Sequence, residues 1–260
     1  MSSELDEMRA LPSALPDPDL ESASAALTAL AMKGVGDEEA RDLVGWLATW
    51  QRRRKPRIVR PRVALFATAH GLAKDDLPYF RTEVRRAIAG EGAWVEECAA
   101  AEAELRLHEM SLNDPTPDIR VGDALSPQAT AHAMLYGMIA VEPGLDLLVV
   151  SALGEGAEDA SRVLDTAIAG GADPMPALGA RGGPDLAAVA GAILAARMAG
   201  TPVLLDGGGA RAAANALAKL DPRSVDHCRD AFLYAGGEAR TGRMGSRAIS
   251  ALRAAASLVE

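Results

Sequence analysis

The sequence predicts an α/β fold, in which a mostly parallel sheet is covered by helices on both faces. Two observations predict this fold. From residue 62 onward, short apolar runs alternate with helix-like segments, and this alternation is typical of parallel strands joined by crossover helices. The chain has 260 residues, of which 49% are hydrophobic, so it can bury a large core and is not wholly disordered.

The first 58 residues precede this alternation and form the N-terminal part of the chain. Residues 1–22 are acidic and carry three prolines, so we expect an extended arm there. Residues 24–51 have apolar side chains at three- and four-residue spacing, which predicts helix. The basic run at residues 52–57 predicts an exposed connector. A phosphate-binding patch is the less favoured alternative, because no aromatic residues lie among the charges.

Apolar runs predict five strands, and longer amphipathic or alanine-rich stretches predict the helices between them. The strands are expected at residues 63–67, 104–108, 145–150, 202–206 and 231–234. The helices are expected at residues 77–89, 126–141, 158–169, 184–199 and 210–220. Pro184 and Asp185 suit the first turn of their helix, because proline fits the first helical position and a carboxylate stabilises the positive end of the helix dipole.

Composition excludes several classes of function. The chain has 27 Lys and Arg against 36 Asp and Glu, and a net charge of −9 argues against a general nucleic-acid binder. The sequence contains no run of about 18 apolar residues, so no membrane-spanning helix is expected. The N-terminus lacks the basic and apolar regions of a signal peptide, so a soluble cytoplasmic protein is expected. The chain has only two cysteines, so a disulfide scaffold is not expected. Its four histidines lack the spacing of metal ligands, so no metal site is expected.

Ligands of parallel α/β sheets bind at the carboxyl ends of strands, and three glycine-containing loops fall at or near such positions. These loops are residues 153–156, 181–184 and 206–209. Each could let backbone amides approach a phosphate, although a plain tight turn is the more ordinary interpretation. Glu155, Glu158 and Asp159 crowd the first loop and make it a poor phosphate site, because like charges repel.

Three further residues lie at positions where function is conceivable. His70 follows the first strand and precedes Gly71, which suits either the rim of an active site or a polar turn. Asp206 ends its strand, where its carboxylate could bind a ribose hydroxyl or cap a helix. Cys98 lies in an alanine-rich helical stretch and is expected to pack in the core.

Several segments, read in order, resemble the nicotinate-nucleotide–dimethylbenzimidazole phosphoribosyltransferases. Residues 173–220 contain Asp-Pro-Met-Pro-Ala-Leu, Gly-Gly, Ala-Gly-Ala-Ile-Leu-Ala-Ala and Pro-Val-Leu-Leu-Asp-Gly, in the order that this family has them. Upstream, residues 63–73 resemble the family's strand ending F-A-G-D-H-G-V-A. Residues 243–245 resemble the start of its R-L-G-E-G-T-G-A segment.

The resemblance implies transfer of phosphoribosyl from nicotinate mononucleotide to 5,6-dimethylbenzimidazole, a step of cobalamin lower-ligand synthesis, without a metal or other cofactor. It implies a Rossmann-like three-layer domain at residues 59–240. Apolar helix faces near the two termini predict a small helical part, formed by residues 1–58 and by a C-terminal helix within residues 241–260. The resemblance also implies a homodimer. The expected ligand-binding residues are His70, Gly71, Gly154, Gly156, Asp206 and Gly207, with His70 at the base pocket.

The sequence departs from the family at its two glutamates. Ser246 stands where the family has the glutamate that takes the proton from the benzimidazole nitrogen, and Ala152 stands at the second glutamate. A serine hydroxyl cannot act as a general base at neutral pH without a base of its own. Glu155 is therefore the expected substitute base. The alternative is a catalytically inactive paralogue that binds a small ligand or a partner subunit.

Overall fold

A five-stranded sheet forms the centre of the molecule in the computed structural model, which describes residues 3–73, 77–236 and 240–260. Its strands are β1 (Pro61–Thr68), β2 (Glu104–Ser111), β3 (Leu147–Leu153), β4 (Val203–Leu205) and β5 (Cys228–Asp230). They lie in the order β2-β1-β3-β4-β5, and every neighbouring pair is parallel. The predicted α/β fold with a parallel sheet is therefore confirmed.

β1 and β3 are the central strands of this sheet, and all of their residues are buried. Such strands have nearly continuous apolar sequences because helices cover both faces. Their register pairs Phe66 with Ala152 and Ala67 with Leu153, so the two strands end side by side. The residues that follow β1 and β3 are consequently brought together at one edge of the sheet.

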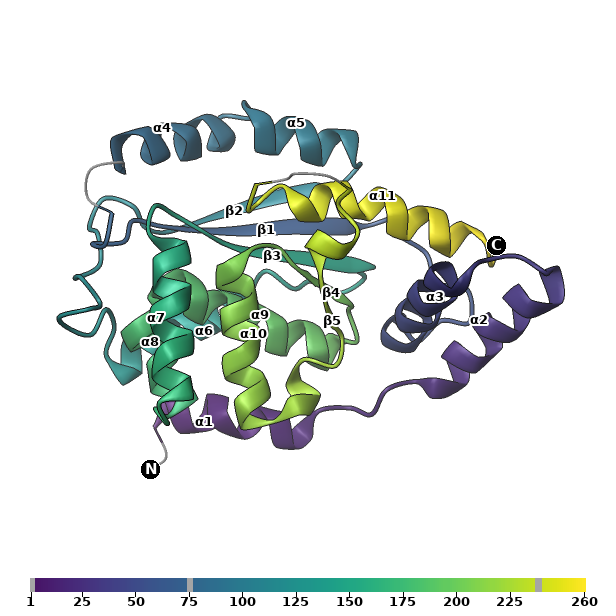
Figure 1. Cartoon of the computed structure of the whole chain (residues 1–260), viewed down its shortest axis with the longest axis horizontal. Coiled ribbons are helices and arrows are strands. Elements are labelled where there is room, and N and C mark those ends of the chain that lie inside the picture. Colours follow the sequence, from purple (N-terminus) through teal and green to yellow (C-terminus); the bar gives the residue numbers. More distant parts are fainter. Residues whose placement is uncertain (1–2, 74–76, 237–239) are drawn as a thin grey trace.

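Eleven α-helices belong to the part of the chain that the structure describes. They are α1 (Glu4–Ala10), α2 (Leu20–Lys33), α3 (Glu38–Gln51), α4 (Leu77–Ile88), α5 (Ala93–Ala100), α6 (Pro127–Met138), α7 (Ala157–Ala169), α8 (Pro174–Gly182), α9 (Pro184–Ala199), α10 (Gly208–Leu220) and α11 (Met244–Ser257). In Figure 1, α4, α5 and α11 lie on one side of the sheet, and α6 to α10 with α1 lie on the other.

Two apolar clusters make up the core, one on each face of the sheet. Alternate residues of a strand point to opposite faces, so Phe66 joins the cluster with α6, α8, α9 and α10, whereas Leu65 joins the cluster with α3, α4 and α11. Many small side chains line α9, of which thirteen residues are buried. There Gly191 lies against the backbone of Met134 on α6, because a Cβ built on it would stand 1.9 Å from the Met134 carbonyl oxygen.

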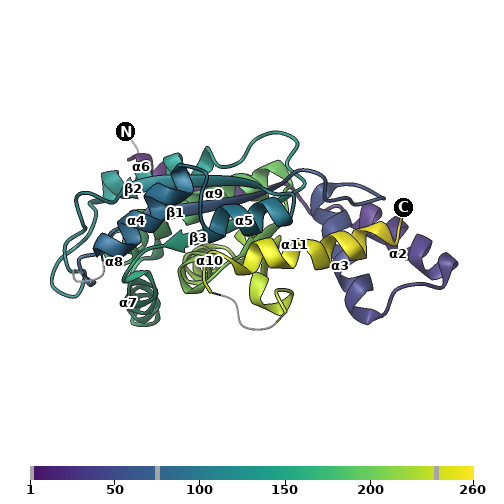
Figure 2. The ribbon, with the colours of Figure 1, turned by 90° about the horizontal axis from the view of Figure 1, so that it is seen from above.

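The helices α2 and α3 lie beyond one end of the sheet, beside the C-terminal half of α11 (Figures 1 and 2). Leu47 of α3 and Leu252 of α11 are both fully buried in the cluster that also contains Leu65 of β1. This shared core joins the N-terminal helices and the C-terminal helix to the sheet. The division of the chain at residues 58 and 240 stays a prediction.

The structure corrects two expectations from the sequence. Residues 231–234 do not form a strand, because β5 ends at Asp230, whose carboxylate accepts the Phe232 amide hydrogen at 3.0 Å and begins a 3₁₀ turn at Ala231–Leu233. Residues 1–22 are not an extended arm throughout. Ser3 forms a capping box that starts α1, a 3₁₀ turn follows at Leu11–Ala14, and α2 already begins at residue 20.

The basic run at residues 52–57 is fastened to the body of the protein. Asp146, whose side chain is almost fully buried, accepts hydrogen bonds from Arg53 at 2.5 Å and from the Val59 and Arg60 amides at 3.1 and 3.0 Å. Arg54 pairs with Glu21. These contacts favour the connector interpretation, because two of the run's cations are already neutralised by acidic side chains.

Candidate functional site

A pocket of about 330 Å³ opens at the carboxyl end of β3, and we call it the α4–α5 pocket. It is lined by Tyr79, Phe80 and Glu83 of α4, Ala93 and Trp94 of α5, Leu153 at the end of β3, Gly154 and Glu155 after it, and Arg240, Thr241 and Arg243 before α11. The pocket thus gathers three aromatic side chains in a chain with an aromatic content of only 3%. Such walls suit a flat aromatic ligand.

Two arginines and one glutamate connect the segment at the start of α11, which forms one wall of this pocket, to α5. Arg243 pairs with Glu97 of α5, and Arg247 contacts the same carboxylate at 3.1 Å. Burial disfavours the charged form of Glu97, but hydrogen bonds from the two arginines outweigh it and hold the pKa of Glu97 below its ordinary value. The cluster therefore ties the start of α11 to α5 around the pocket.

His70 is fully buried behind the turn that follows β3. Its Nε2 lies 3.0 Å from Oδ2 of Asp185, a side chain that is also fully buried. Burial alone would lower the pKa of His70, but the charge of Asp185 and its hydrogen bond raise it above the ordinary value. His70 lines neither the α4–α5 pocket nor the larger pocket near α7, and its place at the base pocket stays a prediction.

The expected glycines differ in their surroundings. Gly154 lines the α4–α5 pocket, and Gly156 begins α7 with a φ of +89°. Gly71 is buried, and its amide donates to the Thr116 hydroxyl at 3.3 Å. Gly207 has a φ of +96°, and a Cβ there would stand 2.3 Å from Cγ2 of Thr241. Gly207 is therefore required for the close approach of the segment before α11.

Asp206 is fully buried, and its carboxylate is used within the protein. Its two oxygens accept the amide hydrogens of Gly242 and Gly245 at 2.8 and 2.9 Å, where α11 begins. Burial raises the pKa of Asp206 to about 6, although these backbone hydrogen bonds oppose the rise. Asp206 therefore holds the start of α11 and does not cap α10, the helix that follows its strand, while its contact with a ribose hydroxyl stays a prediction.

Glu158 occupies the N-terminus of α10. Its Oε1 accepts hydrogen bonds from the Gly208 amide and from the Thr241 hydroxyl, both at 3.2 Å. The N-terminus of a helix attracts anions, because its first amides are unpaired and the helix dipole is positive there. The carboxylate of Glu158 thus takes the place that a bound anionic group would take.

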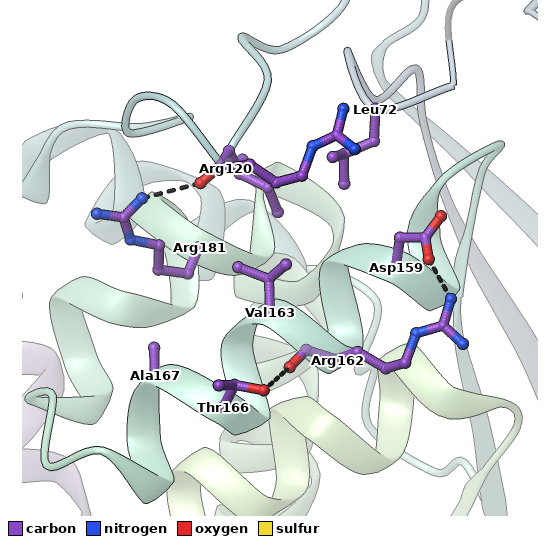
Figure 3. Close-up of a pocket in the computed structure, with 9 residues that line it drawn as sticks. Leu72, Arg120, Asp159, Arg162, Val163, Thr166, Ala167 and Arg181 are labelled. Carbon is purple, nitrogen blue, oxygen red and sulfur yellow. Dashed lines mark hydrogen bonds and ion pairs between the residues drawn. The ribbon is translucent and has the colours of Figure 1, made fainter.

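The acidic residues expected to crowd one loop are in fact separated. Glu155 faces the α4–α5 pocket, Glu158 reaches α10, and Asp159 pairs with Arg162 at a second pocket of about 490 Å³ (Figure 3). Two more arginines line this second pocket, and each already has an acidic partner: Arg120 pairs with Asp118 at 2.6 Å and Arg181 with Asp123 at 3.2 Å. Its arginines are therefore charge-balanced.

The two positions that the sequence resemblance aligns with the family's glutamates, Ser246 and Ala152, supply no proton acceptor to a ligand. The Ser246 hydroxyl donates to the Arg243 carbonyl at 3.0 Å inside α11. Ala152 is buried beside α10, where a Cβ built on Gly209 would stand only 2.6 Å from the Ala152 Cβ. Cys98 is buried in α5, as expected, and burial raises the pKa of its thiol to about 12.

Sequence reasoning missed the aromatic wall and the contact between Glu158 and Thr241. A signal for the wall was present, because Tyr79, Phe80 and Trp94 lie within two short helices in a chain that is poor in aromatic residues. The Glu158 contact left no local signal, because Thr241 is 83 residues away in the sequence.

Within the described residues, no group of three or more His, Cys, Asp or Glu side chains could hold a metal ion. No helix among those that the structure describes is long and apolar enough to cross a membrane.

Comparisons with known proteins identify the family of the chain. The family model DBI_PRT, described as a phosphoribosyltransferase, matches residues 21–172 and 158–236. A nicotinate-nucleotide–dimethylbenzimidazole phosphoribosyltransferase of Brucella anthropi is 33% identical over 266 aligned residues, which cover 86% of this chain and 78% of that protein. The protein of the same name from Brucella canis is 32% identical with the same coverage.

Solved structures share the fold. A structure of the enzyme of this name from Thermus thermophilus superposes with a TM-score of 0.79 at 22% identity, covering 93% of this chain and 96% of that one. A structure of CobT from the same organism gives a TM-score of 0.80 at 21% identity, covering 92% and 96%. Together with the matches in sequence, these findings show that the chain belongs to the DBI_PRT family of phosphoribosyltransferases.

Proposed function

We propose that the chain transfers the phosphoribosyl group of nicotinate mononucleotide to 5,6-dimethylbenzimidazole, the reaction for which its relatives are named. The observation that carries this proposal is the α4–α5 pocket, where aromatic side chains surround a cavity that Glu155 also lines. A benzimidazole is flat and mostly apolar, with two ring nitrogens that need polar partners. The identity of 33% over 86% of the chain supports the same reaction.

The transfer needs a proton acceptor beside the base. A ring nitrogen of the benzimidazole attacks C1′ of the ribose, and the bond between C1′ and the nicotinate nitrogen breaks, so that nicotinate leaves with the bonding electron pair. The substituted benzimidazole then loses the proton of its other ring nitrogen. Glu155 is the residue that we assign to accept this proton, because it lines the pocket and Ser246 cannot serve.

A second function, binding of the base without transfer, is favoured by a specific observation. Glu158 fills the anion position at the N-terminus of α10 with its own carboxylate. A mononucleotide phosphate placed there would have to displace this group against electrostatic repulsion. A chain with this arrangement could bind an aromatic base in the α4–α5 pocket and no mononucleotide.

One experiment separates these functions. The purified chain is incubated with nicotinate mononucleotide and 5,6-dimethylbenzimidazole, chromatography follows α-ribazole phosphate and nicotinate, and calorimetry measures binding of each compound. Equal amounts of both products support transfer. Binding of the base alone, with no product, supports the second function. If neither compound binds and no product forms, both proposals are wrong.

We further propose a homodimer that works in the cytoplasm. Support for the dimer comes from exposed apolar side chains at the end of α6, where Tyr136 is 40% exposed and the following C-cap residue Ile139 is 58% exposed. Apolar side chains in such positions suit the surface between two copies of a chain. Light scattering at micromolar concentration should report twice the monomer mass of 27.0 kDa, and a monomer mass would contradict the dimer.

A further inference from the structure

The pair of His70 and Asp185 has no part in the transfer as proposed above. His70 follows β1, and Asp185 lies in the first turn of α9, 115 residues later. Both side chains are fully buried, and Nε2 of His70 lies 3.0 Å from Oδ2 of Asp185. Neither residue lines the α4–α5 pocket.

The imidazole of His70 packs among glycines from two turns. A Cβ built on Gly156 would stand 3.0 Å from the His70 Cβ, and one built on Gly154 would stand 3.4 Å from its Cδ2. On the other side, a Cβ on Gly183 would stand 3.0 Å from Cε1. The ring and the turn at residues 154–156 therefore fit each other closely, so a change in the ring's position is transmitted to this turn.

Asp185 makes the polar contact that orients the ring. Within the described residues, Nδ1 of His70 and Oδ1 of Asp185 have no hydrogen-bond partner, so the bond from Nε2 to Oδ2 is the single polar contact of the imidazole. A buried pair with unsatisfied atoms gives little stability, and apolar replacements of similar size are often neutral. Stability therefore does not explain why this pair is present.

We propose that His70 and Asp185 are positioning residues that fix the turn at Gly154–Gly156 and, through it, the carboxylate of Glu155 in the α4–α5 pocket. This inference rests on the proposed binding of an aromatic base in that pocket. Gly156 keeps a φ of +89° at the start of α7, so the turn has a defined conformation that its packing must maintain. A displacement of about 1 Å at such a position can slow a reaction by about a hundredfold, because a misplaced reacting group loses its alignment.

The test compares variants of the pair with a matched buried histidine. His227 is also fully buried, and its Nε2 lies 3.1 Å from the Ile193 carbonyl oxygen, next to β5 and outside both pockets. We expect His70→Leu and Asp185→Leu each to weaken binding of 5,6-dimethylbenzimidazole by about tenfold in calorimetry. His227→Leu should leave this affinity unchanged, even if it lowers the melting temperature by as much as His70→Leu does.

Two further variants distinguish positioning from a general loss of structure. Asp185→Asn keeps an oxygen that can accept from Nε2–H, so it should retain the affinity for the base within about threefold. The double variant His70→Leu with Asp185→Leu should bind the base no more weakly than either single variant, since both changes break one contact. Equal affinity in the wild type and His70→Leu would overturn the inference, and so would an equal loss in His227→Leu.

Hydrogen exchange of the 154–157 amides gives a readout that needs no ligand. We expect faster exchange in His70→Leu and Asp185→Leu but not in His227→Leu, because only the first two release the turn. If the wild type binds no base, the proposed function fails while this measurement still decides whether the pair holds the turn. Unchanged exchange in His70→Leu would overturn the inference on its own.

Discussion

Replacing Glu158 by glutamine removes a negative charge from the N-terminus of α10 while keeping the shape of the side chain. An oxygen of the amide can still accept from the Gly208 amide and the Thr241 hydroxyl, which Glu158 now bonds at 3.2 Å each. Two like charges about 4 Å apart repel by about 1 kcal/mol in water and by about 4 kcal/mol near a protein surface. Because Glu158 is exposed, the lower figure applies.

Glu158→Gln should therefore strengthen binding of nicotinate mononucleotide by about fivefold, since 1.4 kcal/mol corresponds to a factor of ten. Calorimetry at low and high salt measures the effect, which should shrink as salt screens the charges. Asp159→Asn is the matched control, because it removes the same charge from the next residue, where Arg162 already neutralises it. Equal or weaker binding by Glu158→Gln at low salt would refute the electrostatic reasoning.

Three further variants test other parts of the structure. Burial raises the pKa of Asp206 to about 6, so the stability linked to its protonation is complete below about pH 4 and is lost as the pH rises through 6. Asp206→Asn should abolish this dependence of the melting temperature on pH. If the dependence persists in Asp206→Asn, another group causes it. Gly207→Ala should cost at least about 1 kcal/mol in urea unfolding, because its φ is +96° and Thr241 is in the way; unchanged stability would contradict that contact. Trp94→Ala should weaken binding of 5,6-dimethylbenzimidazole by about tenfold in calorimetry, and unchanged affinity would place the base elsewhere.

The sequence predicted the elements whose burial leaves a clear pattern of apolar residues, either a continuous run or a helical period. β1 and β3 are buried on both faces, and α9 begins and ends where Pro184 and the periodicity place it. The strand expected at residues 231–234 failed because its two largest aliphatic and phenyl side chains, those of Leu233 and Phe232, lie outside the core. Phe232 is 60% and Leu233 is 67% exposed, and the preceding Asp230 caps a turn instead.

The candidate site was predictable only in part, because its residues come from distant segments. Gly154 and Glu155 follow a strand that the sequence identifies, and both line the α4–α5 pocket. The partners of His70 and Glu158 lie 115 and 83 residues away, and local patterns carry no information on such contacts. The sequence therefore pointed to the edge of the sheet where this pocket lies but could not assign each side chain to its partner.

The role of Glu155 as proton acceptor is tested by the rate at which Glu155→Gln forms α-ribazole phosphate, compared with the rate of Glu83→Gln. Both carboxylates line the α4–α5 pocket, and that of Glu83 pairs with Arg86 of its own helix at 3.1 Å. If Glu155 accepts the proton of the base, Glu155→Gln should be slower than the wild type by about a hundredfold, whereas Glu83→Gln should keep most of the activity. A wild-type rate in Glu155→Gln would show that Glu155 is not the proton acceptor.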